Sequence, residues 1–366
     1  MSHTHLIFRT HVCYKYLVIT TCFPITMSMD AVWKQLSCPS LWEESNGLPC
    51  IPMPLSVASN VFDELDASPT PWHRVLDMIS VAYAYCTHKR QADAIALLRD
   101  CYVYLLPQPY CQHDCALLKQ YRPAMRHVLD SFWAVLEWGR TEATTPSPML
   151  LAFINTITPF QHLSPDLQAA VHAIHGGVTK IQHDVALSYL ERCIMMNRLE
   201  GEWHWMKGNS FWCGDSAVEH LRMAHRLRPG PHTALTLAEN LPLDKCRAEV
   251  AELLGEVLRL YPDHPYVLSH AGRLLLRVHG KTKTMFAEAE RLLLRCRAAI
   301  GDRCFLRLRL GYLIQEQGGR ADEAKRHYET ACRLNPADAG NIRMNYMGDY
   351  SNCVPISLDN LSRMFK

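Results

Sequence analysis

The sequence predicts an all-α fold of stacked helical hairpins, an α-solenoid, and two observations predict it. The first is a pattern of small, leucine and aromatic residues on one helix face, followed by a proline, that occurs three times. The second is that no stretch of useful length alternates apolar and polar residues, as a half-buried β-strand would. The pattern therefore predicts helices that pack in repeated pairs.

The segment 324–336 carries this pattern in full. Ala324 and Ala331 are small enough for a neighbouring helix to come close, Tyr328 fills the space between them, and Pro336 ends the helix. The same order recurs at 217–229 and 250–262; the first two terminal prolines lie 33 residues apart and the last two 74 residues apart, about two such intervals. A period near 34 residues is that of the tetratricopeptide repeat (TPR), so the predicted fold is a TPR superhelix.

The part of the chain before these repeats is also predicted to be helical. A short helical segment is expected at 30–47, before several prolines. Residues 72–105 predict a helix pair, because Ala82 and Ala94 are twelve residues apart, as the small residues of the two helices of a TPR are. An apolar helical region at 112–140 precedes a polar loop at 141–147.

Two more helices are expected at 149–157 and 165–175. Ser164-Pro165 is a helix-start signal, and Gly176-Gly177 is predicted to end the second helix. Residues 186–196 repeat the second-helix pattern without the proline. From there on, the predicted helix pairs are 199–229, 232–262, 265–300 and 303–336.

These expectations divide the chain into three parts. Residues 29–336 form the TPR superhelical domain, residues 337–366 are a C-terminal tail with a weak helix, and residues 1–28 are an unfolded N-terminal extension that precedes a natural start at Met27 or Met29. A signal peptide is the alternative for the apolar run 16–23. That run is short and contains threonines, and no small-residue cleavage site follows it.

Composition bounds the class of protein. The 366 residues are 48% hydrophobic with a net charge of +2, ordinary values for a soluble protein. The 15 cysteines are odd in number and have no framework spacing, and Cys193 and Cys296 occupy helix positions where repeats take alanine. They predict free thiols in a reducing compartment. No run of about 20 apolar residues exists, so we expect a cytoplasmic protein without a membrane span.

Charge is concentrated late in the chain. Between residues 271 and 310 there are ten basic and three acidic residues, a net charge of +7. Phosphate binding depends on such a local excess, because each neutralised phosphate releases counterions. Arg273 and Arg277 are four residues apart on one predicted helix, with Tyr266 nearby, and a tyrosine beside arginines suits a stacked base and its phosphate. A solvated helix face is the alternative interpretation.

Three segments resemble one family, the interferon-induced proteins with tetratricopeptide repeats (IFIT). Leu36-x-Cys38-x-x-x-Trp42-Glu43 is similar to its N-terminal signature. The segment 221–229, Leu-Arg-Met-Ala-His-Arg-Leu-Arg-Pro, and the segment 265–273, Pro-Tyr-Val-Leu-Ser-His-Ala-Gly-Arg, resemble two of its repeat segments. The resemblance covers about residues 30–336.

The resemblance implies a cytosolic, antiviral protein that binds single-stranded RNA, with a 5′-triphosphate or an altered cap, in a basic tunnel. It implies that Tyr266 contacts RNA, that Arg273 is a basic residue of the same helix, and that Arg307 stands where the family places a pocket histidine. Ser269 stands where the family has an RNA-contacting arginine, and Trp212 stands near where it has a central arginine. The predicted RNA-binding residues are Tyr266, Arg273, Arg277, Arg307 and Trp205.

An aromatic cluster, Trp203-His204-Trp205 with Phe211-Trp212, has two interpretations. It is either repeat core or, in part, a stacking platform in the groove. If Gly208 is the close-packing residue of its helix, Trp205 points inward and Trp203 points toward the neighbouring repeat.

Other site chemistries are not expected. Cys111-x-His113-x-Cys115 lacks the paired spacing of a structural zinc site and has no second pair, and no phosphate-binding glycine loop of the P-loop type is present. We therefore predict no enzyme activity, no cofactor and no metal. The alternatives to an RNA-binding protein are an adaptor that grips a peptide or a partner's helix, including homo- or hetero-oligomers of related TPR proteins, and a scaffold without a ligand.

Overall fold

The computed structural model describes residues 36, 53–106, 115–140, 146–180, 182–210 and 215–346. Every regular element in these ranges is helical, so the all-α prediction is confirmed. The first elements are α3 (Leu55–Glu64), the 3₁₀ helix η2 (Leu65–Ala67), α4 (Pro71–Thr87), α5 (Gln91–Leu105), α6 (Cys115–Arg140), α7 (Pro148–Ile154), the 3₁₀ helix η3 (Phe160–His162), α8 (Pro165–Val178) and α9 (His183–Met196). The later ones are α10 (Gly201–Ser210), α11 (Asp215–Leu227), α12 (Pro231–Asn240), α13 (Leu243–Leu260), α14 (Pro265–His279), α15 (Lys283–Ile300), α16 (Cys304–Gln317), α17 (Ala321–Leu334) and α18 (Ala339–Tyr346).

The helices pair as the repeat pattern predicts. α10 packs on α11, α12 on α13, α14 on α15 and α16 on α17, and two earlier pairs are α4 with α5 and α8 with α9. Small residues let the two helices of a pair come close: a Cβ on Gly208 would lie 2.7 Å from Leu221 Cγ, and one on Gly311 would lie 2.5 Å from the Tyr328 ring. Tyr328 therefore fills the space that the repeat pattern assigns to it.

Gly176 and Gly177 do not end a helix, contrary to the prediction. Helix α8 continues through both residues to Val178. A Cβ on Gly176 would lie 2.8 Å from Leu190 Cγ, and one on Gly177 would lie 2.6 Å from Leu76 Cδ2. The two glycines are present because α4 and α9 pack closely against α8, and this need outweighs their low helix propensity.

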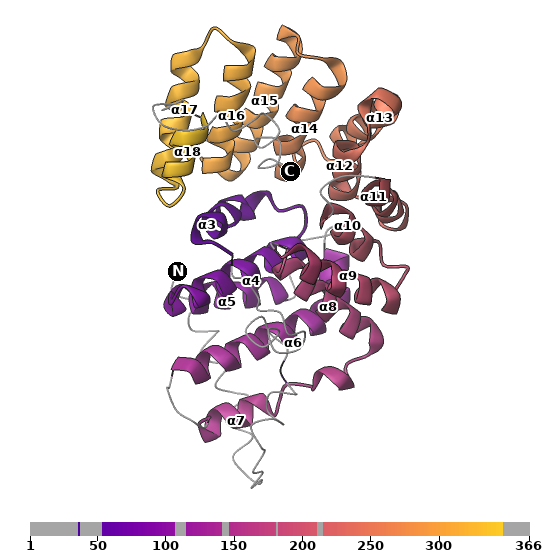
Figure 1. Ribbon diagram of the computed structural model, residues 1–366, viewed down its shortest axis with the longest axis vertical. Coiled ribbons are helices and arrows are strands. Elements are labelled where there is room, and N and C mark those ends of the chain that lie inside the picture. Colours follow the sequence, from indigo (N-terminus) through magenta and orange to yellow (C-terminus); the bar gives the residue numbers. More distant parts are fainter. Residues whose placement is uncertain are drawn as a thin grey trace.

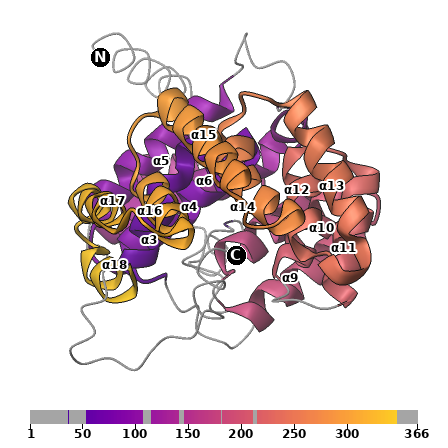
Figure 2. The same cartoon turned by 90° about the horizontal axis from the view of Figure 1, so that it is seen from above.

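The N-terminal helix lies against the last repeats. Figure 1 shows α3 beneath α16 and α18, and Figure 2 shows the same helices together from above. Asp66 of η2 is ion-paired with Arg303, 237 residues later, and Asp63 Oδ2 accepts the backbone N–H of Phe305 at 2.8 Å. Asn60 Nδ2 donates to Asp338 Oδ2 at 3.0 Å. These contacts bring the two ends of the described chain together around a cavity, which we call the hollow.

The centre of the molecule is aromatic. The rings of Trp72, Tyr121 and Trp203 lie with centroids 5.1–6.1 Å apart, and each side chain is almost completely buried. They come from α4, α6 and α10, so this cluster joins the N-terminal helices to the repeats. No helix among the described residues is long and apolar enough to cross a membrane.

Some sequence predictions fall outside the described residues. These are the extension 1–28, most of the segment 30–47, Phe211 and Trp212, Cys111 and His113, and the tail beyond Tyr346. Leu36 is described, and it packs in a separate apolar cluster with Trp138 of α6 and Leu150 and Ile154 of α7. Within the predicted tail, α18 packs on α17.

Candidate nucleic-acid interface

Side chains of three successive first helices lie together at one side of the hollow, which His270 and Arg309 line, and we call this group the inner wall. It consists of Thr236 and Glu239 of α12, Tyr266, His270 and Arg273 of α14, and Arg309 of α16. The first helix of each pair supplies these residues because the second helix covers its other side. The inner wall contains two of the predicted site residues, Tyr266 and Arg273.

Tyr266 and His270 form an aromatic pair on α14. They are four residues apart, which places them on one helix face, and their ring centroids lie 4.4 Å apart with 33° between the planes. Burial raises the pKa of the Tyr266 phenol, which also hydrogen-bonds to the side chain of Thr236. Burial, with the positive charge of Arg309, lowers the pKa of His270. Tyr266 is thus protonated and His270 neutral at pH 7.

Glu239 organises the middle of the inner wall. Its Oε1 lies 3.2 Å from His270 Nδ1 and 2.5 Å from Arg273 Nη2. Burial raises the pKa of Glu239, but the His270 hydrogen bond and the Arg273 charge outweigh it, so the net pKa is about 2. Glu239 is therefore ionised at neutral pH and holds Arg273 in place.

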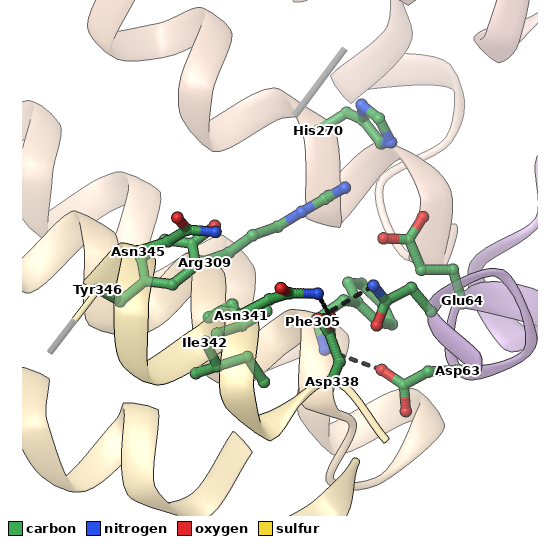
Figure 3. Close-up of a pocket in the computed structure, with 12 residues that line it drawn as sticks. Asp63, Glu64, His270, Phe305, Arg309, Asp338, Asn341, Ile342, Asn345 and Tyr346 are labelled. Carbon is green, nitrogen blue, oxygen red and sulfur yellow. Dashed lines mark hydrogen bonds between the residues drawn. The ribbon is translucent and has the colours of Figure 1, made fainter. Parts of the chain in front are cut away.

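Arg309 extends across the hollow from α16. Figure 3 shows its guanidinium reaching toward His270, on the side that faces Glu64 of α3. Its Nη1 donates to the carbonyl of Ser269 at 2.8 Å, and its guanidinium carbon lies 5.2 Å from the ring centroid of Phe305. Arg309 is not among the predicted RNA-binding residues, although the sequence contains a signal for its place on the inner wall. Arg309 and His270 each stand two residues before a packing glycine, Gly311 and Gly272.

A cavity of about 160 Å³ lies beside the inner wall, where α3 meets the last repeats. Glu64 is exposed to solvent inside the hollow, yet the protein around it raises its pKa by desolvation. Figure 3 shows that carboxylates and amides gather here around Arg309. The lining residues are Asn60, Asp63, Glu64, His270, Phe305, Leu308, Arg309, Asp338, Asn341, Ile342, Asn345 and Tyr346.

Arg277 is engaged with the backbone. Its guanidinium donates to the carbonyls of Ala238, Glu239 and Leu241 at 2.6–3.0 Å. These oxygens belong to the C-terminal end of α12, where the last carbonyls have no partner within the helix. Arg277 therefore caps α12 from the neighbouring repeat, and desolvation there lowers its pKa.

Arg307 is held by a neighbouring carboxylate. Its Nε and Nη2 each lie 2.6 Å from an oxygen of Asp302, and its Nη1 lies 3.4 Å from His327 Nδ1. His327 belongs to α17, the second helix of the pair. Arg307 thus lies between α16 and α17, and the structure does not bring it together with Tyr266 or Arg273.

Trp205 is mostly buried behind the inner wall. It is 9% exposed, and its indole N–H donates to Thr236 Oγ1 at 3.0 Å. Its ring lies edge-on to His73, with centroids 4.5 Å apart. Gly208 does pack closely against Leu221, as expected, while Trp203 turns to the central aromatic cluster with Trp72 and Tyr121.

The positive charge of residues 271–310 is largely paired in the structure. Four of its basic side chains meet carboxylates from outside that stretch: Arg273 with Glu239, Lys281 with Glu316, Arg295 with Asp263, and Arg303 with Asp66. Arg291 and Arg295 lie on α15, a second helix. The inner wall is consequently much less basic than the net charge of the stretch suggests.

Comparison with known proteins supports the fold. No family model and no curated protein match this sequence. Among solved structures, a human IFIT1 dimer with PPP-AAAA matches with a TM-score of 0.59 and 15% identity over 88% of this chain and 74% of that one. A human IFIT1 dimer with m7Gppp-AAAA matches with a TM-score of 0.61 and 14% identity, over 92% and 77%. The chain therefore has an IFIT-like TPR fold, as its sequence resemblance implies.

Proposed function

We propose that this protein binds single-stranded RNA in its hollow, against the inner wall, without catalysing a reaction. One observation carries the proposal: Arg273 shares the Glu239 carboxylate with His270, and Arg309 of the next first helix donates to the carbonyl of Ser269 beside it. Two guanidinium groups and an aromatic pair thus converge on one point. Such groups suit the phosphates and the bases of a single strand.

Each group of the inner wall has a defined part in this proposal. Arg273 and Arg309 bind phosphate oxygens, and the ring of His270, which packs on the buried ring of Tyr266, contacts a base. Glu239 accepts hydrogen bonds from the amino group of a base, once phosphate takes its place on Arg273. Arg277 and Trp205 support the wall from behind, and Arg307 takes no part.

The paired charges predict a moderate salt dependence. For single strands, log K falls with log salt with a slope of about −0.7 for each neutralised phosphate, so two arginines give a slope of about −1.4. A site that used all the basic residues of 271–310 would show a much steeper slope. Sequestration of RNA from translation, as in antiviral immunity, is the biological role that fits such a protein.

The test measures binding of fluorescent oligoadenylates, with 5′-triphosphate and 5′-hydroxyl ends, by anisotropy across a salt series. The variant R273E/R309E reverses both wall charges, and K283E/R291E makes the same charge change on α15. We expect the first to weaken binding at least about tenfold and the second to leave it nearly unchanged. Equal effects of the two variants, or full binding by R273E/R309E, would contradict the proposal.

A second function, docking of a basic peptide, is favoured by the acidic cavity. Asp63, Glu64 and Asp338 line it together with three asparagines. Carboxylates attract lysine and arginine side chains and repel phosphate. A peptide-binding adaptor would capture a lysine-rich peptide, lose affinity in E64Q, and carry no nucleic acid through purification.

A further inference from the structure

Three polar side chains from distant parts of the chain converge in the core beneath Trp205. They are His73 of α4, Glu202 of α10 and His232 of α12, and we call them the buried triad. Their exposed fractions are 4%, 0% and 3%. They are 129 and 30 residues apart in the sequence, and these intervals match no metal-binding motif, so the sequence alone does not indicate this cluster.

The atoms of the buried triad face one another. His73 Nε2 lies 2.7 Å from Glu202 Oε1, and His232 Nε2 lies 3.2 Å from Glu202 Oε2. One ligand atom from each residue lies within 4.8 Å of the others. His73 Nε2 and Glu202 Oε1 are both buried, and no other described atom is a hydrogen-bond partner of either.

The outer contact of His73 fixes which nitrogen faces Glu202. Its Nδ1 lies 2.7 Å from Thr70 Oγ1, the side chain that caps α4. With Nδ1 protonated and donating to that hydroxyl, Nε2 presents a lone pair to the triad. Metal-binding histidines have this arrangement, in which a second polar group holds the opposite ring nitrogen.

The buried carboxylate of Glu202 needs a partner that compensates for the loss of its hydration. Glu202 is completely buried, and an imidazole lies against each of its two carboxylate oxygens. An ionised carboxylate that is buried away from water requires a cation beside it. A divalent cation or an imidazolium can fill this role.

We propose that the buried triad binds a zinc ion, with His73 Nε2, His232 Nε2 and a Glu202 oxygen as ligands. Two histidines and one glutamate are an established donor set for zinc, with bonds of about 2.0–2.2 Å, and the second oxygen of Glu202 can take the fourth position. Tetrahedral ligands at that bond length are about 3.3 Å apart, so the observed 2.7 and 3.2 Å require only a small spread of the side chains. Binding needs both Nε2 atoms unprotonated, so any imidazolium proton leaves to solvent.

Zinc at this place would have a structural role. The buried triad joins α4 to α10 and α12, and the ring of Trp205 lies edge-on to both imidazoles, with centroids 4.5 and 5.3 Å away. The ion would therefore fix the N-terminal helices against the repeats and hold Trp205 behind the inner wall. RNA binding is not required for this site.

The test measures zinc by mass spectrometry in full-length protein from zinc-supplemented culture. We expect about one tightly held zinc per chain in the wild type and in H220Q, and loss of it in E202Q. H220Q is the matched control, because it changes one member of a histidine pair outside the buried triad, in which His204 Nδ1 and His220 Nδ1 lie 3.0 Å apart. A wild type free of zinc, or zinc lost in H220Q and kept in E202Q, would overturn the proposal.

A second measurement avoids variants that fail to fold. Cobalt(II) is introduced into wild-type protein during refolding, and the visible spectrum is recorded. Nitrogen and oxygen ligands give tetrahedral cobalt bands without the strong near-ultraviolet sulfur bands, which separates the buried triad from the cysteines. Absence of bands in folded protein, or sulfur bands alone, would count against the site.

Discussion

Arg228 places two guanidinium nitrogens, Nε and Nη2, on the two carboxylate oxygens of Glu200, each at 2.9 Å. Glu200 is 4% exposed, and it also accepts the hydroxyl of Tyr121 at 2.9 Å and the backbone N–H of Glu202 at 3.1 Å. The pair lies where α10 begins, so it joins the loop after α11 to the central aromatic cluster. Its position explains how the repeats attach to α6.

Removal of Arg228 is predicted to be costly. In R228A the carboxylate of Glu200 stays buried without its cation, and loss of one partner of a buried pair destabilises by about 3 kcal/mol. R222A removes an exposed arginine that pairs with Glu249, and exposed pairs contribute about 0–1 kcal/mol. Urea unfolding followed by circular dichroism compares the two, and equal midpoints would show that the Glu200 pair contributes nothing.

Two glycine substitutions are predicted to have opposite signs. In G311A the new Cβ would lie 2.5 Å from the ring of Tyr328, whose hydroxyl is fixed by Gln315, and overpacking costs about 1–3 kcal/mol. Gly255 lies in α13 with no atom within 4 Å of such a Cβ, so G255A is expected to stabilise by about 0.5–1 kcal/mol. Thermal midpoints that shift in the same direction would contradict this packing.

Removal of the Arg277 side chain is predicted to lower the stability of the fold more than the affinity for RNA. R277M leaves the carbonyls of Ala238, Glu239 and Leu241 without their charged donor, and a loss of about 2 kcal/mol is expected. RNA affinity, measured well below the unfolding temperature, is expected to change less than in R273E. A strong loss of affinity with unchanged stability would instead place Arg277 in the RNA site.

Acid is predicted to destabilise the protein through His172. Burial lowers the pKa of its imidazole to about 4 in the fold, while the unfolded chain has the ordinary value near 6.5. Between these values the unfolded state binds more protons, so stability is full above pH 6.5 and is lost as the pH falls toward 4. At pH 5 the loss is up to about 2 kcal/mol.

The variant H172F tests this titration. It keeps a ring against Tyr189, which stacks on His172 with centroids 5.8 Å apart, and it removes the proton-binding group. We expect the fall in the unfolding midpoint between pH 7 and pH 5 to become smaller than in the wild type. The exposed residue His162 provides the control, and H162F with the same effect would contradict the assignment.

The sequence predicts local features of this fold well and distant contacts poorly. Tyr328 and Pro336 predict their helix because spacing on one helix face is a local property. The prediction that Gly176 and Gly177 end a helix is wrong, because glycine occurs both at helix ends and where helices pack closely. Only the contacts with Leu76 and Leu190 show that these two glycines serve close packing.

The candidate site shows the same limit. The spacing of Tyr266 and Arg273 predicted a shared helix, and both lie on the inner wall. The carbonyls that engage Arg277 and the carboxylate that pairs with Arg303 come from other repeats, so the net charge of 271–310 overstated the basic surface. The buried triad is also assembled by three helices and leaves no pattern in the sequence.

The most direct test of RNA binding in the hollow is ultraviolet cross-linking of an oligoadenylate to the wild-type protein. The linked peptides are then identified by mass spectrometry. RNA binding in the hollow predicts cross-links in α14 and α16, centred on His270 and Phe305, which line the cavity. Cross-links confined to the second helices α13, α15 and α17, or no cross-link under conditions that label a known RNA-binding protein, would contradict RNA binding in the hollow.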